Sequence, residues 1–161
     1  MLSNTNRIRP AALQFLKQGA YTTALPGTKD YYEYWDEEKQ RCLYGYTADE
    51  GTEDEFKVTG FHYFYLNYCP IDRAIDEVLP DGTVQSRRER TFPSFYDGDW
   101  DYFNEIDRAR AENKHMIVLK ARRKGYSYKA GSMLARNYFF LRNSKNFVFA
   151  SQKEYLIGDG L

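Results

Sequence analysis

Apolar side chains recur at helical spacing in three stretches of the chain, and this spacing predicts three helices. They cover residues 6–19, 97–113 and 127–141. Gly19 marks the end of the first, because glycine commonly follows the last turn of a helix. The second opens on several acidic residues, which the positive amino-terminal end of the helix dipole favours.

Runs rich in aromatic and branched apolar residues predict strands elsewhere. "YYEYWDEEKQRCLYGY", residues 31–46, is predicted to form a two-stranded element that turns at the polar "DEEKQ". The aromatic stretch 58–71 is predicted as a strand or a strand-turn-strand, and a Pro-Asp-Gly turn is expected at 80–82. Short apolar runs at 116–119 and 147–150 predict two buried strands.

The last third of the chain alternates helix, strand, loop, helix and strand. This alternation is typical of a parallel α/β sheet, so we expect the α/β fold class. We divide the chain into residues 1–90, a small α+β N-terminal region with aromatic strands, and residues 91–161, the start of the α/β domain. Because an open parallel sheet usually needs more than two strands, we expect this chain to be the N-terminal part of a longer protein.

Composition restricts the kind of site that the chain can carry. Lys+Arg and Asp+Glu both total 23, so the formal net charge is zero and any basic site must be local. Cys42 and Cys69 form no CxxC motif, which favours a reducing compartment over a disulfide framework. We find no apolar run long enough to span a bilayer, and we expect a soluble, intracellular protein.

A basic, glycine-containing turn, "KARRKGYS" at residues 120–127, separates the strand predicted at 116–119 from the following helix. The standard phosphate loop between a strand and a helix is G-x-x-x-x-G-K-[ST]. Gly125 matches its second glycine and Ser127 its hydroxyl, but Tyr126 replaces the lysine. Lys120 takes the place of the first glycine, and its long side chain can reach the same phosphates from the front of the loop.

Two arginines, Arg122 and Arg123, lie inside this loop. Guanidinium groups near a γ-phosphate stabilise the charge that builds during phosphoryl transfer. A second interpretation stays open, in which the basic residues form a solvated turn and Gly-x-Ser caps a helix. A further basic cluster, "SRRER" at residues 86–90, is interpreted as a solvated turn in preference to a contact with DNA phosphates.

Three segments in the same order resemble the large terminase subunits of tailed bacteriophages. "VLKARRKGYSYKAGSM" is similar to their deviant Walker A segment, in which the lysine sits at the start of the loop. "TGFHYFYLNYCPI" is similar to an aromatic segment that precedes the ATPase core, and "FPSFYDGDWDYFNEI" resembles the helix that carries the adenine-binding motif. Together they span roughly the last hundred residues, which makes chance similarity less probable than for one loop.

The resemblance implies an incomplete P-loop NTPase core of the ASCE type and the N-terminal portion of an ATP-driven motor. The motor would move viral double-stranded DNA into a procapsid, and the full-length protein would also be an endonuclease. ATP and Mg²⁺ are the implied cofactors. The implied partners are DNA, the portal protein, the small terminase subunit and further copies in a homo-oligomeric ring, without a membrane, in the host cell cytoplasm.

The resemblance also implies roles for single residues. The nucleotide-binding set would be Lys120, Ala121, Arg122, Arg123, Lys124, Gly125, Tyr126, Ser127, Tyr128 and Asp99. Ser127 would hold Mg²⁺, and Arg122 or Arg123 would sense the γ-phosphate as the catalytic arginine. Asp99 stands near the position where the family's adenine motif often has glutamine, so the adenine contact departs from the pattern.

The acidic Walker B strand of the family is not found before Leu161. We therefore expect this chain by itself to hydrolyse little or no ATP. Two other functions stay open on the sequence. One is a helicase-like ATPase that acts on nucleic acid outside packaging, and the other is a non-catalytic viral docking module whose basic turn binds an acidic partner.

Overall fold

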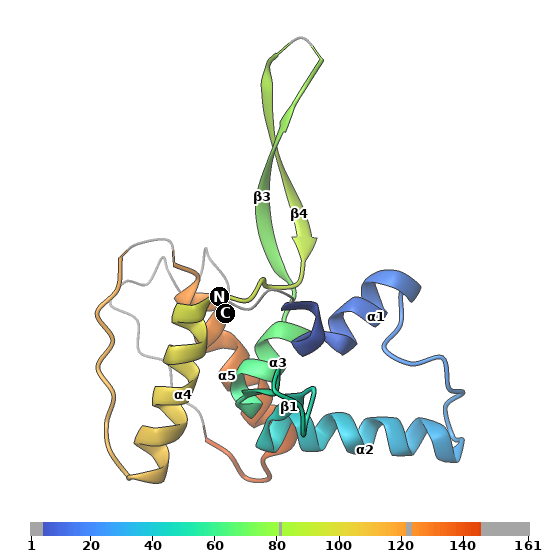
Figure 1. Ribbon diagram of the computed structural model, residues 1–161, viewed down its shortest axis with the longest axis vertical. Helices are drawn as coiled ribbons and strands as arrows, with labels where there is room; N and C mark the ends of the chain where they lie inside the picture. The colour runs from blue at the N-terminus through green and yellow to red at the C-terminus, as the bar shows by residue number, and fades with distance from the viewer. Residues whose placement is uncertain (1–4, 81, 122–123, 146–161) are drawn as a thin grey trace.

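The computed structural model describes residues 5–80, 82–121 and 124–145. Over these residues the chain forms a small α+β domain, in which helices gather around a central helix and one hairpin projects outward (Figure 1). The elements are the 3-10 helix η1 (Thr5–Ile8), α1 (Pro10–Gln18), α2 (Lys29–Tyr44), β1 (Tyr46–Ala48), β2 (Phe56–Val58), α3 (Gly60–Tyr68), β3 (Ile71–Val78), β4 (Val84–Thr91), α4 (Asp97–Ala111) and α5 (Tyr126–Phe140).

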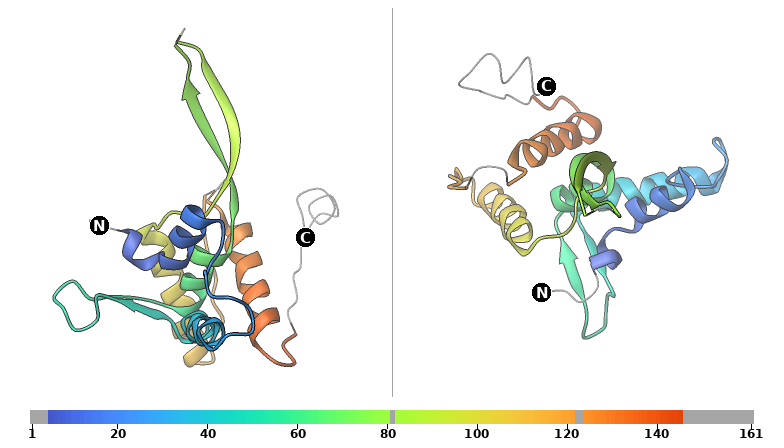
Figure 2. Two further views of the ribbon diagram at one scale, coloured as in Figure 1. Left: turned by 90° about the vertical axis from the view of Figure 1, so that its right-hand side faces the viewer. Right: turned by 90° about the horizontal axis from the view of Figure 1, so that it is seen from above.

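The α3 helix is the centre of the domain, with α1 and α2 on one side and α4 and α5 on the other (Figure 2). Eight of its nine residues are buried. A helix that is apolar on every side is stable only when other elements surround it. Thr59 caps its start by accepting a hydrogen bond from the His62 backbone amide at 3.2 Å. The strand predicted for residues 58–71 is therefore wrong, because cap and all-round packing outweigh the β preference of the aromatics.

Close packing at the start of α3 depends on Gly60. A Cβ atom at this residue would lie 2.5 Å from the Cys42 carbonyl oxygen, so only glycine lets α3 approach the end of α2. At the other end of α3, the Asn67 side-chain oxygen accepts hydrogen bonds from the backbone amides of Ala11 and Ala12, at 3.1 and 3.2 Å. Asn67 thus satisfies amide groups in the first turn of α1.

The two-stranded element predicted for residues 31–46 is also wrong, because this segment forms most of α2. Thr28 caps the helix by accepting from the Tyr31 amide, and Lys29 pairs with Glu33 one turn later. The buried Glu38 carboxylate anchors α2 to α3, where it accepts hydrogen bonds from the hydroxyls of Tyr63 at 2.8 Å and Tyr68 at 2.5 Å. These local pairs and the buried anchor outweigh the strand preference of the tyrosines.

Both sheets of the described chain are antiparallel pairs. β1 pairs with β2 in the register Tyr46↔Val58, and the acidic residues 49–55 connect the two strands. β3 pairs with β4 in the register Ile71↔Thr91, and the turn predicted at 80–82 lies at the tip of this hairpin, where the Gly82 amide donates to the Leu79 carbonyl. The hairpin stands away from the helices in Figure 1 and in the left view of Figure 2.

The predicted α/β class is wrong, because the described residues contain no parallel sheet. The first predicted strand, residues 116–119, lies in an extended segment without a strand partner there, and Ile117 and Leu119 are 91% and 96% exposed. An apolar run becomes a strand only where a neighbouring strand supplies hydrogen bonds, and none lies beside it in the described chain. The second predicted strand, 147–150, lies outside the described residues.

The three predicted helices are confirmed, as η1 with α1, α4 and α5. The proposed boundary at residue 90 falls inside β4, near the base of the hairpin. The α3 helix from the first part packs against α4 and α5 from the second. No helix in the described ranges is long and apolar enough to cross a membrane.

Candidate functional site

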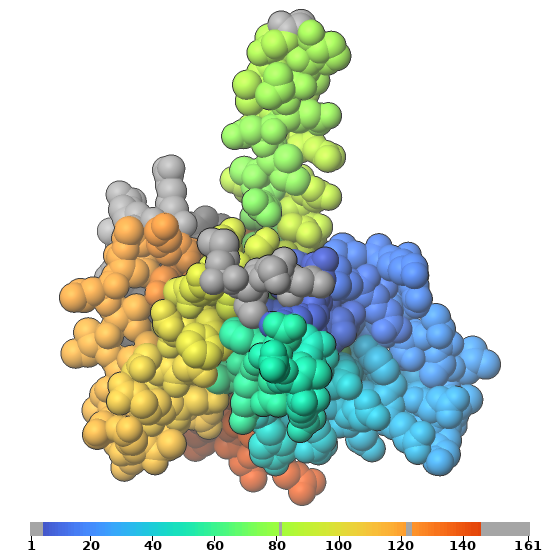
Figure 3. All heavy atoms as spheres, viewed as in Figure 1, coloured from blue at the N-terminus to red at the C-terminus, as the bar shows by residue number. Residues whose placement is uncertain are grey.

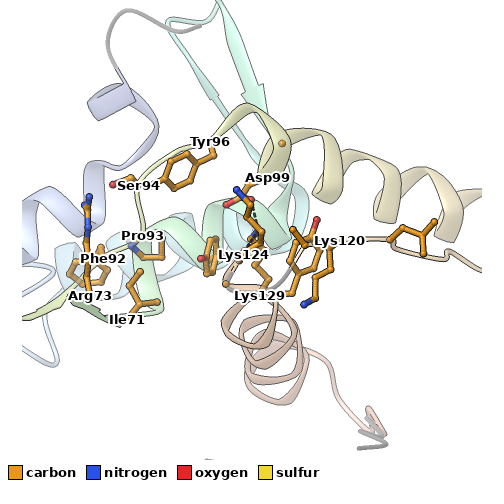
Figure 4. A pocket seen from close by; sticks show the side chains of 16 residues that line it. Ile71, Arg73, Phe92, Pro93, Ser94, Tyr96, Asp99, Lys120, Lys124 and Lys129 are labelled. Atoms are coloured by element: carbon orange, nitrogen blue, oxygen red, sulfur yellow. Dashed lines mark hydrogen bonds and ion pairs between the residues drawn. The ribbon is translucent and has the colours of Figure 1, made fainter. Parts of the chain in front are cut away.

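A cavity of about 500 Å³ opens where four parts of the chain meet. It lies between the end of α3, the base of the β3–β4 hairpin, the start of α4 and the turn that leads into α5 (Figure 4). Its lining residues are Tyr65, Ile71, Arg73, Phe92, Pro93, Ser94, Tyr96, Gly98, Asp99, Leu119, Lys120, Ala121, Lys124, Gly125, Tyr126 and Lys129. Four of these are basic and one is acidic, so the cavity has a local positive charge in a chain of zero net charge.

The lysines gather at the α5 end of the cavity. Figure 4 shows Lys120, Lys124 and Lys129 at this end, with Arg73 at the hairpin end beside Ile71 and Phe92. The Lys120 ammonium lies 5.5 Å from the centre of the Tyr126 ring, within the range of a cation–π contact. The Tyr126 ring therefore lies beside the basic end of the cavity. Its lysines come from the chain before Gly125 and from the helix after it.

The α5 helix begins at this end, directly after Gly125. Gly125 has φ 69°, in the left-handed region that glycine adopts without strain, and this conformation turns the chain from the extended segment into the helix. α5 has no side-chain cap and no acidic residue in its first turn. The dipole of a helix favours negative charge at such a start.

Lys129, one turn into α5, forms a buried ion pair with Asp99 in the first turn of α4. Its ammonium also donates to the Lys124 carbonyl at 3.2 Å and lies 4.2 Å from the Tyr126 ring centre. Burial raises the pKa of Asp99, while the hydrogen bond and the positive charge of Lys129 lower it. The pair joins α4, the turn and α5 into one wall of the cavity.

His62 lies behind this wall, between the rings of Phe95 and Phe103, at 5.5 and 4.9 Å between ring centres. It is fully buried, and neither ring nitrogen has a hydrogen-bond partner among the described residues. Burial, and secondarily the charge of Lys129, lowers its pKa to about 3. His62 is therefore neutral near pH 7 and adds no charge to the site.

Most of the residues that the sequence predicted for nucleotide binding meet at this cavity. Lys120, Ala121, Lys124, Gly125, Tyr126 and Asp99 all line it. Ser127 and Tyr128 are exposed in the first turn of α5 and do not line it. Arg122 and Arg123, the predicted catalytic residues, lie outside the described residues.

Asp99 stands near the position where the family's adenine motif often has glutamine, but its carboxylate is not free to contact a base with both oxygens. One of its carboxylate oxygens is bound by Lys129, so the residue positions a lysine as well as facing the cavity. In the described part of the chain, no group of three or more metal-ligating side chains comes together. The donor set of the cavity suits an anion with several phosphate oxygens better than a metal held by protein ligands alone.

Sequence reasoning missed two cations of the site, Lys129 and Arg73. Lys129 had a local signal, because it follows Gly125 by four residues and so lies above the start of the same helix. Arg73 had none, since the register of a hairpin far away in the sequence brings it to the cavity. The aromatic wall of Tyr65, Phe92 and Tyr96 likewise depends on tertiary packing.

The three segments that resemble terminase sequences contribute to this one cavity. "TGFHYFYLNYCPI" supplies Tyr65 and Ile71, and the basic loop supplies the lysine end. "FPSFYDGDWDYFNEI" supplies Phe92, Pro93, Ser94, Tyr96, Gly98 and Asp99. No family model, curated protein or solved structure matches this chain. Any function assigned to this chain therefore depends on the geometry of the cavity and on the motifs themselves.

Proposed function

We propose that the cavity binds ATP with its phosphates at the lysine end, and that the chain is the N-terminal portion of a viral DNA-packaging ATPase of the terminase large-subunit kind. One observation carries the proposal. Lys120, Lys124 and the start of α5 meet at one end of the cavity, and apolar and aromatic residues line the other end, where Arg73 is the one basic side chain. A nucleoside triphosphate has the same division, with its charge at one end and a flat base at the other.

The phosphates would be bound by two kinds of donor. Backbone N–H groups of the first turn of α5 offer fixed dipoles, and Gly125 lets a phosphate approach the backbone without a Cβ in the way. Lys120 supplies a mobile charge from the extended side of the turn. Lys129 is held by Asp99, so its part is to fix the turn and to add positive potential.

The base would lie against the aromatic side of the cavity. Phe92 is buried and gives a fixed apolar surface, whereas Tyr96 is 58% exposed and is free to pack against a ligand. Stacking on aromatic side chains is tolerant of base identity. Because Lys129 already binds one oxygen of Asp99, a contact between Asp99 and the base would use only the other oxygen.

Mg²⁺ would be held chiefly by the phosphates and by water, as is usual for this ion. The Ser127 hydroxyl, which lies next to the lining residue Tyr126 but outside the lining itself, is the proposed protein ligand. When bound, the ion would neutralise charge on the β- and γ-phosphates. The chain's own residues bind and orient the triphosphate. The role of Arg122 or Arg123 in sensing the γ-phosphate is part of the proposal.

The wider assignment, DNA packaging, is supported by the resemblance of the three segments and by their meeting at one cavity. From the resemblance come the proposed translocation of double-stranded DNA, the nuclease activity of the full-length protein, the portal and small-subunit partners, the homo-oligomeric ring and the host cytoplasm. If the three segments form one nucleotide site, they should meet at one cavity although they are distant in the sequence.

Titration of the chain with a fluorescent ATP analogue, with and without Mg²⁺, tests the proposal. Lys120→Ala should weaken binding at least about tenfold, the effect of losing one charge-assisted contact. Lys39→Ala is the matched control, because Lys39 is exposed on α2 and does not line the cavity, and it should leave the affinity unchanged. AMP should compete far less well than ATP.

Equal affinity of the wild type and Lys120→Ala for ATP, or no saturable binding, would contradict the proposal. If an acidic peptide instead bound in a Lys120-dependent way and ATP did not, the basic turn would belong to a docking module. Inorganic triphosphate as a competitor separates the phosphate contacts from those of the base.

A further inference from the structure

The β3–β4 hairpin forms an arm that nothing in the described chain covers. The space-filling view shows it rising clear of the helices (Figure 3). Apart from three half-buried residues of its two strands, Ile71, Ile75 and Thr91, the strand residues are exposed. An isolated two-stranded hairpin is at best marginally stable in water, so an arm of this length calls for a partner along its surface.

The two strands of the arm carry opposite charge. β3 has three acidic residues and one arginine, and β4 has three arginines and one glutamate, which gives net charges of −2 and +2. The charges of the two strands thus cancel and are separated across the width of the arm. A duplex DNA partner would meet one attractive and one repulsive strand, so the arm is poorly suited to it.

The separation is sharper on one face of the arm. Because facing residues of an antiparallel pair lie on the same side, the register puts Asp72, Ala74, Asp76 and Val78 of β3 on one face with Arg90, Arg88, Ser86 and Val84 of β4. Both charged residues that β3 contributes there are acidic, and both that β4 contributes are basic.

Part of this charge is neutralised inside the arm, and part is not. Arg90 pairs with Asp72 at 3.1 Å. Arg88 faces Ala74, and Asp76 faces Ser86, whose hydroxyl it binds. Neither Arg88 nor Asp76 forms an ion pair with any residue that the structure describes. Each is a charge placed on the arm with no opposite charge across from it.

Both outer edges of the arm are also open, because the sheet has only two strands in the described chain. An open edge presents backbone N–H and C=O groups to any strand that fits beside it. Proteins normally protect such an edge or use it to bind a further strand.

We propose that the arm binds the arm of a second copy of this chain, with the β4 edge of one copy against the β3 edge of the next, and Arg88 beside the neighbour's Asp76. This order brings +2 against −2, whereas β3 against β3 or β4 against β4 would bring like charges together. The contact joins two different edges, so it is heterologous and repeats from copy to copy as a ring or a filament.

The proposal does not depend on nucleotide binding, and its test leaves the cavity intact. Sedimentation velocity of the full chain over a concentration series should show species larger than the 19.0 kDa monomer that dissociate as salt is added. Arg88→Glu and Asp76→Lys should each raise the dissociation constant about tenfold, since each turns an attractive cross-strand pair into a repulsive one. The double variant Arg88→Glu/Asp76→Lys should restore it to within about threefold.

A shortened arm supplies the second measurement and a check on folding. Replacing residues 74–88 by Asn-Gly joins the facing residues Arg73 and Glu89 in a two-residue turn and keeps the cavity lining. This variant should bind the ATP analogue like the wild type and stay monomeric. A wild-type chain that is monomeric at every concentration, an assembly that survives the shortening, or single charge variants that associate normally would each overturn the proposal. Shortening that lowers DNA binding and leaves association unchanged would make the arm a DNA contact and overturn it too.

Discussion

Lys129 of α5 and Asp99 of α4 form a buried ion pair at the wall of the cavity, although thirty residues separate them in the sequence. The pair links the helix start that would bind phosphate with the segment that would face the base. Lys129 also donates to the Lys124 carbonyl, so the same side chain holds the turn. Both the stability of the fold and the shape of the cavity should therefore depend on it.

Replacing Lys129 by methionine should lower the free energy of unfolding by about 3 kcal/mol, because it leaves a buried carboxylate without its partner. Lys124→Met is the control, since Lys124 is exposed, and it should change the stability by less than about 0.5 kcal/mol. Urea unfolding followed by tryptophan fluorescence measures both. Adding Asp99→Asn to Lys129→Met should recover part of the loss, and no recovery would show that the ion pair is not its cause.

Alanine substitutions at two glycines, Gly125 and Gly131, should change the stability in opposite directions. Gly125→Ala should lower the stability by about 1 kcal/mol and weaken binding of the ATP analogue, because an alanine is strained at φ 69°. Gly131→Ala lies within α5 with open space around it and should raise the stability by about 0.5 to 1 kcal/mol. Thermal unfolding and the binding titration measure the two effects. Equal behaviour of the two variants would contradict the assigned helix start.

His62 should make the protein less stable as the pH falls below about 6.5. Its pKa in the folded chain is lowered to about 3 from the ordinary value of 6.5, so the unfolded chain takes up a proton in this interval and the folded chain does not. Between pH 7 and 5.5 this effect should remove about 1 kcal/mol of the free energy of unfolding.

Comparing His62→Phe with the wild type at the two pH values isolates this contribution, because the phenyl ring keeps the stack between Phe95 and Phe103 and cannot be protonated. Between pH 7 and 5.5 the free energy of unfolding of His62→Phe should fall by about 1 kcal/mol less than that of the wild type. An unchanged pH dependence in His62→Phe would show that another group titrates.

The chain by itself should bind ATP and hydrolyse little of it. Asp99 is the one acidic residue among those that the structure places at the cavity, and Lys129 engages it, so no carboxylate there is placed to orient an attacking water. Phosphate release from ATP and Mg²⁺ should stay near the level of a protein-free control. Robust turnover that disappears in Lys120→Ala would contradict this expectation and would place a complete catalytic site within the 161 residues.

The sequence by itself determined the helices with a clear stripe and the chemistry of the basic turn. The helices α1, α4 and α5 follow from apolar residues at helical spacing, and the turn closed by the Gly82 amide and the Leu79 carbonyl follows from local conformational preference. The motif from Lys120 to Tyr126 could be singled out because its residues are neighbours in the chain. These patterns involve residues that are close in the sequence, so they can be recognised without knowledge of the fold.

The tertiary structure decided the rest. Aromatic residues fit strands and helices alike, and the burial of α3 on all sides, with Glu38 of α2 held by Tyr63 and Tyr68, selected helices where strands were predicted. The run at 116–119 stays extended because a strand needs a neighbour to bind its backbone. Arg73 joined the site only through packing, since no local pattern records which distant residues a fold brings within reach.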